Sequence, residues 1–313
     1  MNDPCIICRS TEHRFVCRKN GFDLVRCNSC GLVSVTPLPV KKELEDYYKE
    51  GYNQFLYSFT SPLTKPAARK TKELKIVERH ANGRRLLDVG SAHGHFMENA
   101  RLHGWNVTGV EPQDEARTLA KSRFPHHVHQ DLSAVSEATF DAATLWHVIE
   151  HIANPIEFLS SIGAKLSPDS IIAIATPNVD SLVAKATGKS WGWLSPPDHL
   201  YLYSPRTLPR LLELAGFEVL EIITRRGQSR NFLFLMLQAI TYRLGLFASV
   251  KSSVRIAAGK AQSSKSVTGK LSIFYIVERI TGLFSLLLTP GLLVLWRMGF
   301  GDEVLAVGRK KKQ

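Results

Sequence analysis

Residues 86–94 read Leu-Leu-Asp-Val-Gly-Ser-Ala-His-Gly, an apolar run that leads directly into a turn with spaced glycines. The pattern predicts a buried strand over Arg85–Val89, a tight turn, and a helix over Phe96–Leu102. Gly90 and Gly94 let the backbone turn sharply and approach a ligand closely, because glycine has no Cβ. A strand, turn and helix in this order are typical of the first unit of a nucleotide-type α/β site.

An acidic residue follows at the spacing that such a site requires. Glu111 ends a second apolar run, over 106–111, about 20 positions after the turn. A carboxylate at that place lies where the ribose hydroxyls of a nucleoside would be bound. The combination favours a nucleoside-binding unit over the alternative, an ordinary strand–helix turn without a ligand.

The residue types in the turn indicate which nucleoside fits. A dinucleotide fingerprint has three glycines for a pyrophosphate, whereas this pattern is Asp88-x-Gly90-x-Ala92-x-Gly94. It resembles motif I of the class I S-adenosylmethionine-dependent methyltransferases, although the family's usual middle glycine is Ala92 here. The carboxylate at the strand end suits the cationic amino-acid end of that cofactor and would repel a pyrophosphate.

The resemblance implies S-adenosyl-L-methionine as the cofactor and indicates which residues bind it. Asp131 falls where family members contact the adenine amino group, and its alternative role is a cap at a strand end. The implied cofactor-binding residues are Asp88, Gly90, Ala92, Gly94, Glu111 and Asp131.

Outside the turn, apolar strand patterns alternate with helical ones, which predicts a parallel, doubly wound sheet. Further strands are expected over 140–146, 170–176, 217–223 and 303–307, with a helix over 204–216. The resemblance covers about 70–225 and the last strand. It points to the branch that contains ubiquinone-type O-methyltransferases and many bacterial sugar methyltransferases, and implies a mostly parallel, seven-stranded, Rossmann-like α/β fold.

Residues 1–40 carry two Cys-x-x-Cys pairs whose spacing is typical of a four-cysteine zinc site. Four thiolates close a tetrahedral site and leave no open position, so the zinc is expected to be structural. The intervening stretch predicts a β-hairpin with its turn at Asn20-Gly21, against which Cys17 packs. A disulfide framework is disfavoured because the N-terminus does not resemble a signal peptide. The expected zinc ligands are Cys5, Cys8, Cys27 and Cys30.

Candidate catalytic residues follow the strand over 140–146, because ligands bind beyond the carboxyl ends of such strands. His147, Glu150 and His151 share one face if this segment is helical, and a histidine there can take a proton from an acceptor hydroxyl. Ubiquinone-type enzymes have Glu-x-x-Glu-His here, a pattern implicated in divalent-metal binding. His147 replaces the first acid, which keeps a ligand but makes metal dependence doubtful. The alternative is that Glu150 and His151 only orient the sheet edge.

The loop over 188–199 is long enough to form a wall of an acceptor pocket. His199 is a second candidate base. Trp191 and Trp193 can stack on a sugar or ring, or can equally serve as packing anchors.

The formal charge of +12 favours a polyanionic partner, with solubility as the simpler explanation. Two uncharged, Phe- and Leu-rich stretches flank a wholly basic segment, 251–270, before the last strand. They predict either an interfacial hairpin on anionic lipid or a helical subdomain packed on the core or a dimer face. The expected location is cytoplasmic, with peripheral association on the cytoplasmic face of the membrane if these stretches form the interfacial hairpin. No oligomeric state is predicted.

The expected organisation is a zinc ribbon over 1–40, a linker with helices over 41–82, a methyltransferase domain over 83–228 plus 299–313, and an apolar helical insertion over 229–298. The expected activity is methyl transfer to a hydroxyl or sugar carbon of a glycan, nucleotide-sugar or lipid-linked molecule. One alternative is an RNA base methyltransferase, disfavoured because Leu145-Trp-His-Val stands where those enzymes usually have Asn/Asp-Pro-Pro-aromatic, so nucleic acid is an unlikely partner. The other is a non-catalytic, membrane-associated binding protein, disfavoured by the intact turn and Glu111.

Overall fold

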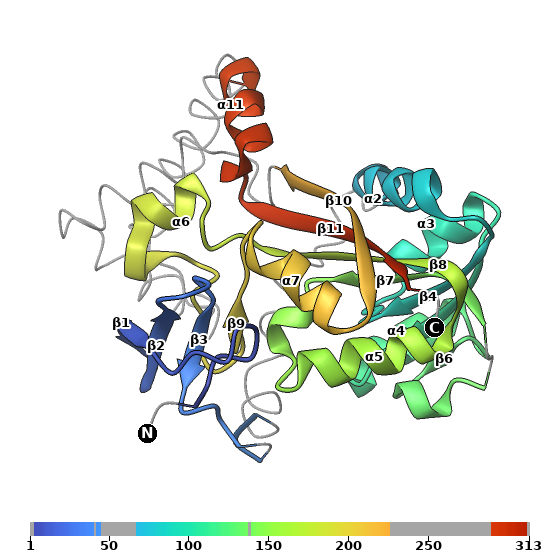
Figure 1. The fold of residues 1–313 in the computed structure, drawn as a ribbon. Coiled ribbons are helices and arrows are strands. Elements are labelled where there is room, and N and C mark those ends of the chain that lie inside the picture. Colours follow the sequence, from blue (N-terminus) through green and yellow to red (C-terminus); the bar gives the residue numbers. More distant parts are fainter. Residues whose placement is uncertain (1–2, 41, 45–66, 137–138, 226–288, 312–313) are drawn as a thin grey trace, which may run out of the picture. The chain divides into compact units, whose positions relative to one another are not determined.

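The computed structural model describes residues 3–40, 42–44, 67–136, 139–225 and 289–311 (Figure 1). The chain divides into two compact units. The first comprises Met1–Pro177, Ser195–Ile223 and Val304–Gln313, and the second comprises Asn178–Leu194 and Thr224–Glu303.

The large sheet has seven strands in the order β10-β11-β8-β7-β4-β5-β6. Its central strands pair in parallel: Leu87 of β4 lies opposite Thr108 of β5 and Ala143 of β7. The predicted parallel, doubly wound sheet is confirmed. The strands are β4 (Arg85–Val89), β5 (Asn106–Val110), β6 (Val128–His129), β7 (Phe140–Trp146), β8 (Leu166–Pro177), β10 (Phe217–Arg225) and β11 (Glu303–Lys310).

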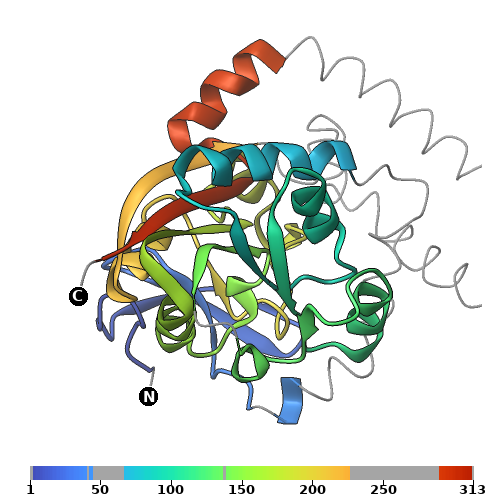
Figure 2. The same ribbon diagram turned by 90° about the vertical axis from the view of Figure 1, so that its right-hand side faces the viewer.

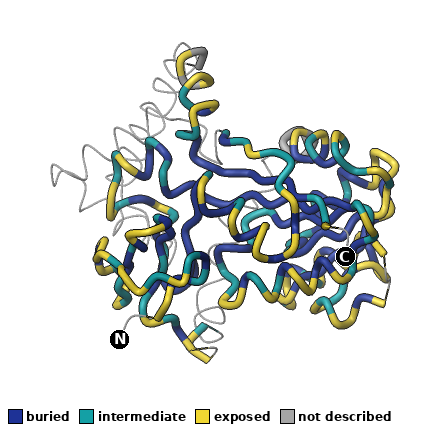
Figure 3. Tube along the Cα trace, viewed as in Figure 1, coloured by how far each residue is buried: buried dark blue, intermediate teal, exposed yellow. Residues whose placement is uncertain are grey.

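Both faces of this sheet are covered, because neighbouring residues of a strand point to opposite sides. Leu86 packs in one apolar cluster with Leu74 and Phe96, whereas Leu87 packs in another with Leu159 and Leu211. Figure 2 shows α2 and α5 on opposite sides of the sheet, and Figure 3 shows its central strands buried. The helices are α2 (Ala67–His80), α3 (His95–Leu102), α4 (Asp114–Arg123), α5 (Pro155–Lys165) and α7 (Thr207–Leu214), with 3-10 turns η1 (Leu132–Ala134) and η2 (Ile149–His151).

A second, four-stranded sheet has the order β1-β2-β3-β9. The predicted hairpin is confirmed: β1 and β2 are antiparallel, and both turn residues, Asn20 and Gly21, have positive φ, as tight hairpin turns require. Cys17 is buried, as expected. The strands are β1 (His13–Lys19), β2 (Phe22–Cys27), β3 (Val33–Thr36) and β9 (Tyr201–Leu202). The first three come from the N-terminal segment, and β9 comes from far along the chain.

The second unit contains α6 (Leu182–Thr187), the 3-10 turn η3 (Gly188–Ser190), α11 (Thr289–Leu295) and a π-helical turn, η4 (Trp296–Phe300). Within it, the Asn178 amide donates hydrogen bonds to the carbonyls of Gly299 and Gly301. Trp191 is buried at 3% exposure, which favours the packing role for this residue, and Trp193 is half-buried.

Most of the predicted insertion, including the basic segment, lies outside the described residues, as does most of the predicted linker. Within the described ranges, no helix combines the length and hydropathy that a membrane crossing requires.

Candidate active site

The glycine turn after β4 has a geometry that only small residues tolerate. Gly90 has φ +73°, and a Cβ placed on it would lie 2.4 Å from Cγ2 of Val148. Gly94 has φ +76°, and Ala92 also adopts a positive φ, of 47°. The chain therefore keeps the left-handed conformation at Ala92, where the family normally has glycine.

Glu111 connects this turn to the end of β5. Its side chain is buried, and its two oxygens accept backbone hydrogen bonds from Ala92 at 2.8 Å and Gln113 at 2.9 Å. Burial raises the pKa of the Glu111 carboxyl, while these two hydrogen bonds and the charge of Arg117 act in the opposite direction. A buried carboxylate beside a glycine turn fits the ribose end of a nucleoside.

Two further acids of the expected cofactor set differ in their surroundings. Asp88 is buried at the end of β4 and accepts a hydrogen bond from the Thr144 hydroxyl at 2.7 Å. Asp131 is exposed and caps η1, accepting from the backbone N–H groups of Ser133 and Ala134. The hydrogen bonds from Ser133 and Ala134 lower the pKa of Asp131. Asp131 therefore has the capping role that was the alternative in the sequence analysis. Its contact with the adenine amino group stays a prediction.

The segment after β7 lies directly beside the cofactor turn, because Val148 is the residue that packs against Gly90. His147 has a positive φ of 60°, and its Nδ1 lies 3.4 Å from Oε1 of Glu150. The only helical structure in this segment is a 3-10 turn over 149–151, so His147 does not lie on an α-helical face with Glu150 and His151, as the sequence had suggested. His147 and Glu150 nevertheless lie close together.

Glu150 is completely buried, and its Oε2 accepts a hydrogen bond from the Thr176 hydroxyl at 2.9 Å. Burial alone would raise the pKa of Glu150. The close contact with His147 and the nearby histidines His151 and His199 outweigh this effect and lower the pKa. The result is an ionised carboxylate surrounded by imidazoles.

His151 makes a pair with Asp198, a residue to which the sequence assigned no role. Its Nδ1 lies 2.9 Å from the Asp198 carbonyl oxygen and 3.0 Å from Oδ1 of the same residue. Burial alone would lower the pKa of His151, but the charges of Asp198 and Glu150 raise it to about 9. Asp198 precedes the candidate base His199 in the sequence, and this adjacency is a signal that could have indicated its role.

His199 completes the cluster. It is 3% exposed, and its ring meets that of His151 edge-to-face with the centroids 4.8 Å apart. Ligand atoms of Glu150, His151 and His199 all lie within 4.8 Å of one another, so this group is compatible with a cation. The structure therefore combines His199, rather than His147, with Glu150 and His151 in such a group. We refer to His147, Glu150, His151, Asp198 and His199 as the histidine cluster.

Comparisons with known proteins identify the family of the domain that carries this site. A family model described as "Methyltransferase domain" matches residues 61–222, which is more than half of the chain. The chain belongs to the class I S-adenosylmethionine-dependent methyltransferases. The methyltransferase is similar in fold to a SAM-dependent methyltransferase from Archaeoglobus fulgidus, with a TM-score of 0.50, 18% identity, and coverage of 83% of this chain and 100% of that one.

Curated relatives of the methyltransferase include ubiquinone biosynthesis O-methyltransferases. The protein from Maricaulis maris is 29% identical over 157 residues, which are 45% of this chain and 62% of the relative. The protein from Rhizobium johnstonii is 30% identical over 167 residues, which are 49% of this chain and 66% of the relative. The methyltransferase thus spans less than two thirds of the length of these relatives.

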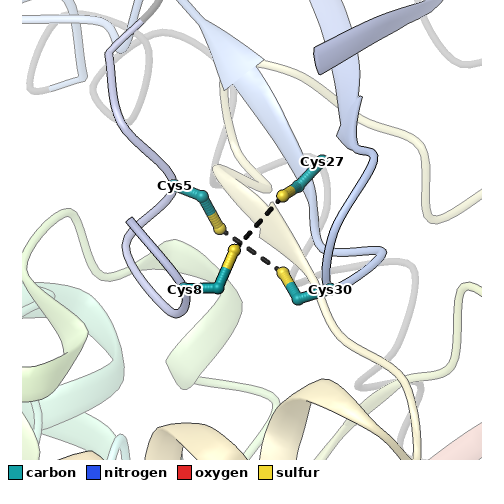
Figure 4. Close-up of side chains that lie close together, drawn as sticks. All are labelled: Cys5, Cys8, Cys27 and Cys30. Carbon is teal, nitrogen blue, oxygen red and sulfur yellow. Dashed lines mark hydrogen bonds between the residues drawn. The ribbon is translucent and has the colours of Figure 1, made fainter. Parts of the chain in front are cut away.

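The four spaced cysteines of the methyltransferase converge on one point (Figure 4). The Sγ atoms of Cys5 and Cys30 are 3.5 Å apart, and those of Cys8 and Cys27 are 3.4 Å apart. These separations exclude a disulfide, whose sulfurs are about 2.05 Å apart. They approach the separation of about 3.8 Å that a tetrahedron with Zn–S bonds of about 2.3 Å gives.

The chemistry of the cysteine group also fits zinc, which binds thiolates. Burial would raise the pKa of Cys27, but hydrogen bonds from the Cys30 backbone and the Cys8 side chain outweigh it and lower the pKa to about 6. Burial raises the pKa of Cys5 and Cys30, and a bound cation would favour their thiolates. Cys5, Cys27 and Cys30 are each at most 5% exposed. Cys8 is half-buried. Four cysteines as ligands would leave no open coordination position for a substrate, in agreement with a structural site.

Proposed function

We propose that the protein transfers the methyl group of S-adenosylmethionine to a hydroxyl of a small acceptor, and that the histidine cluster removes the acceptor's proton. The observation that carries this proposal is the pair of the half-buried His151 and the buried Asp198, joined by His199 and placed beside the cofactor turn through Val148. Parallel strands β4 and β7 end at the same sheet edge, which is where ligands of such sheets bind.

The cofactor residues hold the methyl donor in this proposal. Glu111 binds the ribose, Asp88 faces the cationic amino-acid end, and the turn over 90–94 lets the backbone approach. Bound S-adenosylmethionine supplies an electrophilic methyl group, so the protein mainly positions the reactants and receives one proton.

His151 receives that proton in the proposal. Asp198 fixes the ring through Nδ1, as an orienting carboxylate does for other catalytic histidines. In the proposal, Nε2 of the same ring takes the acceptor's proton. The ionised Glu150 and Asp198 stabilise the imidazolium that forms. His199 restricts the ring of His151 from the side.

A divalent cation held by Glu150, His151 and His199 is the second candidate arrangement. It would supply a Lewis acid for the acceptor oxygen. The compact donor set favours it, and the replacement of an acid by His147 disfavours it. A titration of the chelated protein with magnesium, manganese or zinc, followed by turnover, distinguishes the two arrangements.

The acceptor class follows from several separate indications. The relatives named above carry out O-methylation by name, which supports oxygen as the methylated atom. The resemblance to sugar methyltransferases supports a glycan, nucleotide-sugar or lipid-linked acceptor, with a sugar carbon as the second choice of atom. The sequence after β7 counts against an RNA base, as argued above.

The experiment is methyl transfer from isotopically labelled S-adenosylmethionine to a panel of hydroxylated acceptors that includes ubiquinone precursors and nucleotide-sugars. The wild type is expected to label one class, and His151→Ala is expected to lose about 10²- to 10⁴-fold in turnover. His126→Ala, which changes an exposed histidine remote in sequence from the cluster, serves as the control. If His151→Ala keeps the turnover of the wild type, His151 is not the base.

A further inference from the structure

The four-stranded sheet joins the cysteine ribbon to the segment that carries Asp198 and His199. Its last strand, β9, begins at Tyr201, two residues after His199. Val33 and Ser34 of β3 lie opposite Leu202 and Tyr201 in an antiparallel pair. The ribbon strand β3 and the strand β9, which follows the catalytic segment, are therefore hydrogen-bonded neighbours in one sheet.

The backbone of Leu200 makes a hydrogen bond to each of the two segments. Its carbonyl accepts a hydrogen bond from the N–H of Val35 in the ribbon at 3.0 Å. Its own N–H donates to the carbonyl of Glu150 in the histidine cluster at 2.8 Å. The residue is fully buried, so water does not compete for either bond.

Asn20 holds the other end of the same segment. Its side-chain amide, at the tip of the β1–β2 hairpin, donates to the Pro196 carbonyl at 2.8 Å. The ribbon thus contacts the chain on both sides of Asp198 and His199, at Pro196 before them and at Leu200 after them.

The cysteine group belongs to the same packed core. Cys5, Cys27 and Cys30 share an apolar cluster with Leu200 and Ile149. Four thiolates brought together without a cation would repel one another and would be costly to bury. Loss of the ion is therefore expected to loosen the ribbon at the place where it supports the catalytic segment.

We propose that the ribbon is a positioning element for catalysis: through Asn20 and the β3–β9 pairing it holds the Asp198–His199 segment in register with Glu150 and His151. An ion bound by the four cysteines then controls turnover but not cofactor affinity, because the cofactor turn is built from β4 and β5 through Glu111. This inference rests on the proposed role of the histidine cluster.

The first test is Asn20→Gly in the full-length protein. Asn20 has φ +52°, which glycine adopts readily, so the change keeps the turn and removes only the amide. Turnover is expected to fall about 3- to 100-fold, as misplaced catalytic groups do, while the Kd for S-adenosylmethionine and its KM stay within about two-fold. Arg18→Ala is the matched control, because Arg18 donates to Gly21 in the same hairpin.

The second test needs no methyl transfer. Zinc removal by a chelator, and separately Asn20→Gly, should speed amide hydrogen exchange at Leu200 and Leu202 and shift the imidazole resonances of His199. Exchange at Val89 and Val110 should not change, and added zinc should restore the chelated protein. Arg18→Ala should leave these signals as in the wild type.

The outcomes separate this inference from the proposed function. Full turnover by both His151→Ala and His199→Ala would overturn the proposed function. If His151→Ala and His199→Ala lose turnover but Asn20→Gly keeps the turnover and the hydrogen exchange of the wild type, only the positioning role is overturned. A loss of cofactor affinity as large as the loss of turnover in Asn20→Gly would also contradict it, since the ribbon would then act on the whole fold.

Discussion

The Nδ1 atom of His151 lies 3.0 Å from Oδ1 of Asp198, and a second contact of 2.9 Å joins it to the Asp198 carbonyl. One imidazole nitrogen is therefore committed to a single residue. The other nitrogen is the atom that we propose takes the acceptor's proton, and the adjacent carboxylates of Asp198 and Glu150 stabilise positive charge on the ring. This pairing gives the site a base whose orientation and proton affinity are both set by neighbouring residues.

The pH dependence follows from the raised pKa of His151, about 9, which Asp198 and Glu150 produce against the effect of burial. A general base must be neutral, so turnover should increase with pH until about 9. Asp198→Asn should lower that pKa and move the rising limb to lower pH, while maximal turnover falls because orientation is lost. A pH–rate profile of both proteins checks this, and a wild-type optimum near pH 6 would contradict it.

The same group affects stability with a defined sign. The folded pKa of His151 lies above the value of about 6.5 for an unfolded chain, so its contribution is complete below that pH and is lost as pH rises through about 9. The free energy of unfolding in denaturant should therefore decline between these values, and by less in Asp198→Asn. Equal declines in the two proteins would show that His151 is not the group responsible.

Gly90→Ala should weaken the site by a specific contact. The new Cβ would lie 2.4 Å from Cγ2 of Val148, and the alanine would have to adopt φ +73°, which disfavours a side chain. We expect a loss of about 1 to 3 kcal/mol in stability, together with weaker cofactor binding. Gly104→Ala is the matched control, because Gly104 has φ +81° but nothing within 4 Å of a new Cβ. Thermal unfolding should show a clearly smaller loss of stability in Gly104→Ala than in Gly90→Ala. Equal losses of stability in the two variants would show that the contact with Val148 is not the cause.

Ala92→Gly tests the departure from the family's glycine pattern. Ala92 has φ 47°, a conformation that disfavours a side chain. The variant should bind S-adenosylmethionine as the wild type does and gain about 0 to 1 kcal/mol in stability. A large loss of affinity by calorimetry would mean that the Ala92 methyl contributes to the pocket.

The protein should contain one tightly held zinc per chain. Cys27→Ala should abolish the zinc, because it removes one of four converging ligands, and Cys17→Ala should retain it. Cys17 is buried like Cys27 but does not belong to the metal-capable group. Elemental analysis of protein purified without chelator measures the content, and an absence of zinc from the wild type would reject the site.

Much of the fold was predictable because it follows from local patterns. The strand over Arg85–Val89 and the strand over Phe140–Trp146 have the predicted bounds, since each is an apolar run ended by a turn. The cysteine spacing predicted the cluster, because each pair is local in sequence. The histidines after β7 lie at the carboxyl end of a parallel strand, where the general rule for such sheets places a site, and their catalytic role stays a prediction.

The partners of those histidines were not predictable in the same way. Asp198 meets His151 from a distant loop, and no periodicity links the two positions. The pairing of β3 with β9 depends on the tertiary fold, because β9 is only two residues long and pairs with a strand that is distant in the sequence. His147 was expected on a helical face with Glu150, but the chain takes a positive φ there and forms only a 3-10 turn.

The central claim is that the turn and Glu111 bind S-adenosylmethionine, and isothermal titration calorimetry tests it most directly. The folded, full-length wild type should bind the cofactor saturably and one to one. Glu111→Ala should bind it more weakly by about 1 to 3 kcal/mol, through loss of charged hydrogen bonds to the ribose. No binding by the folded wild type would contradict the account.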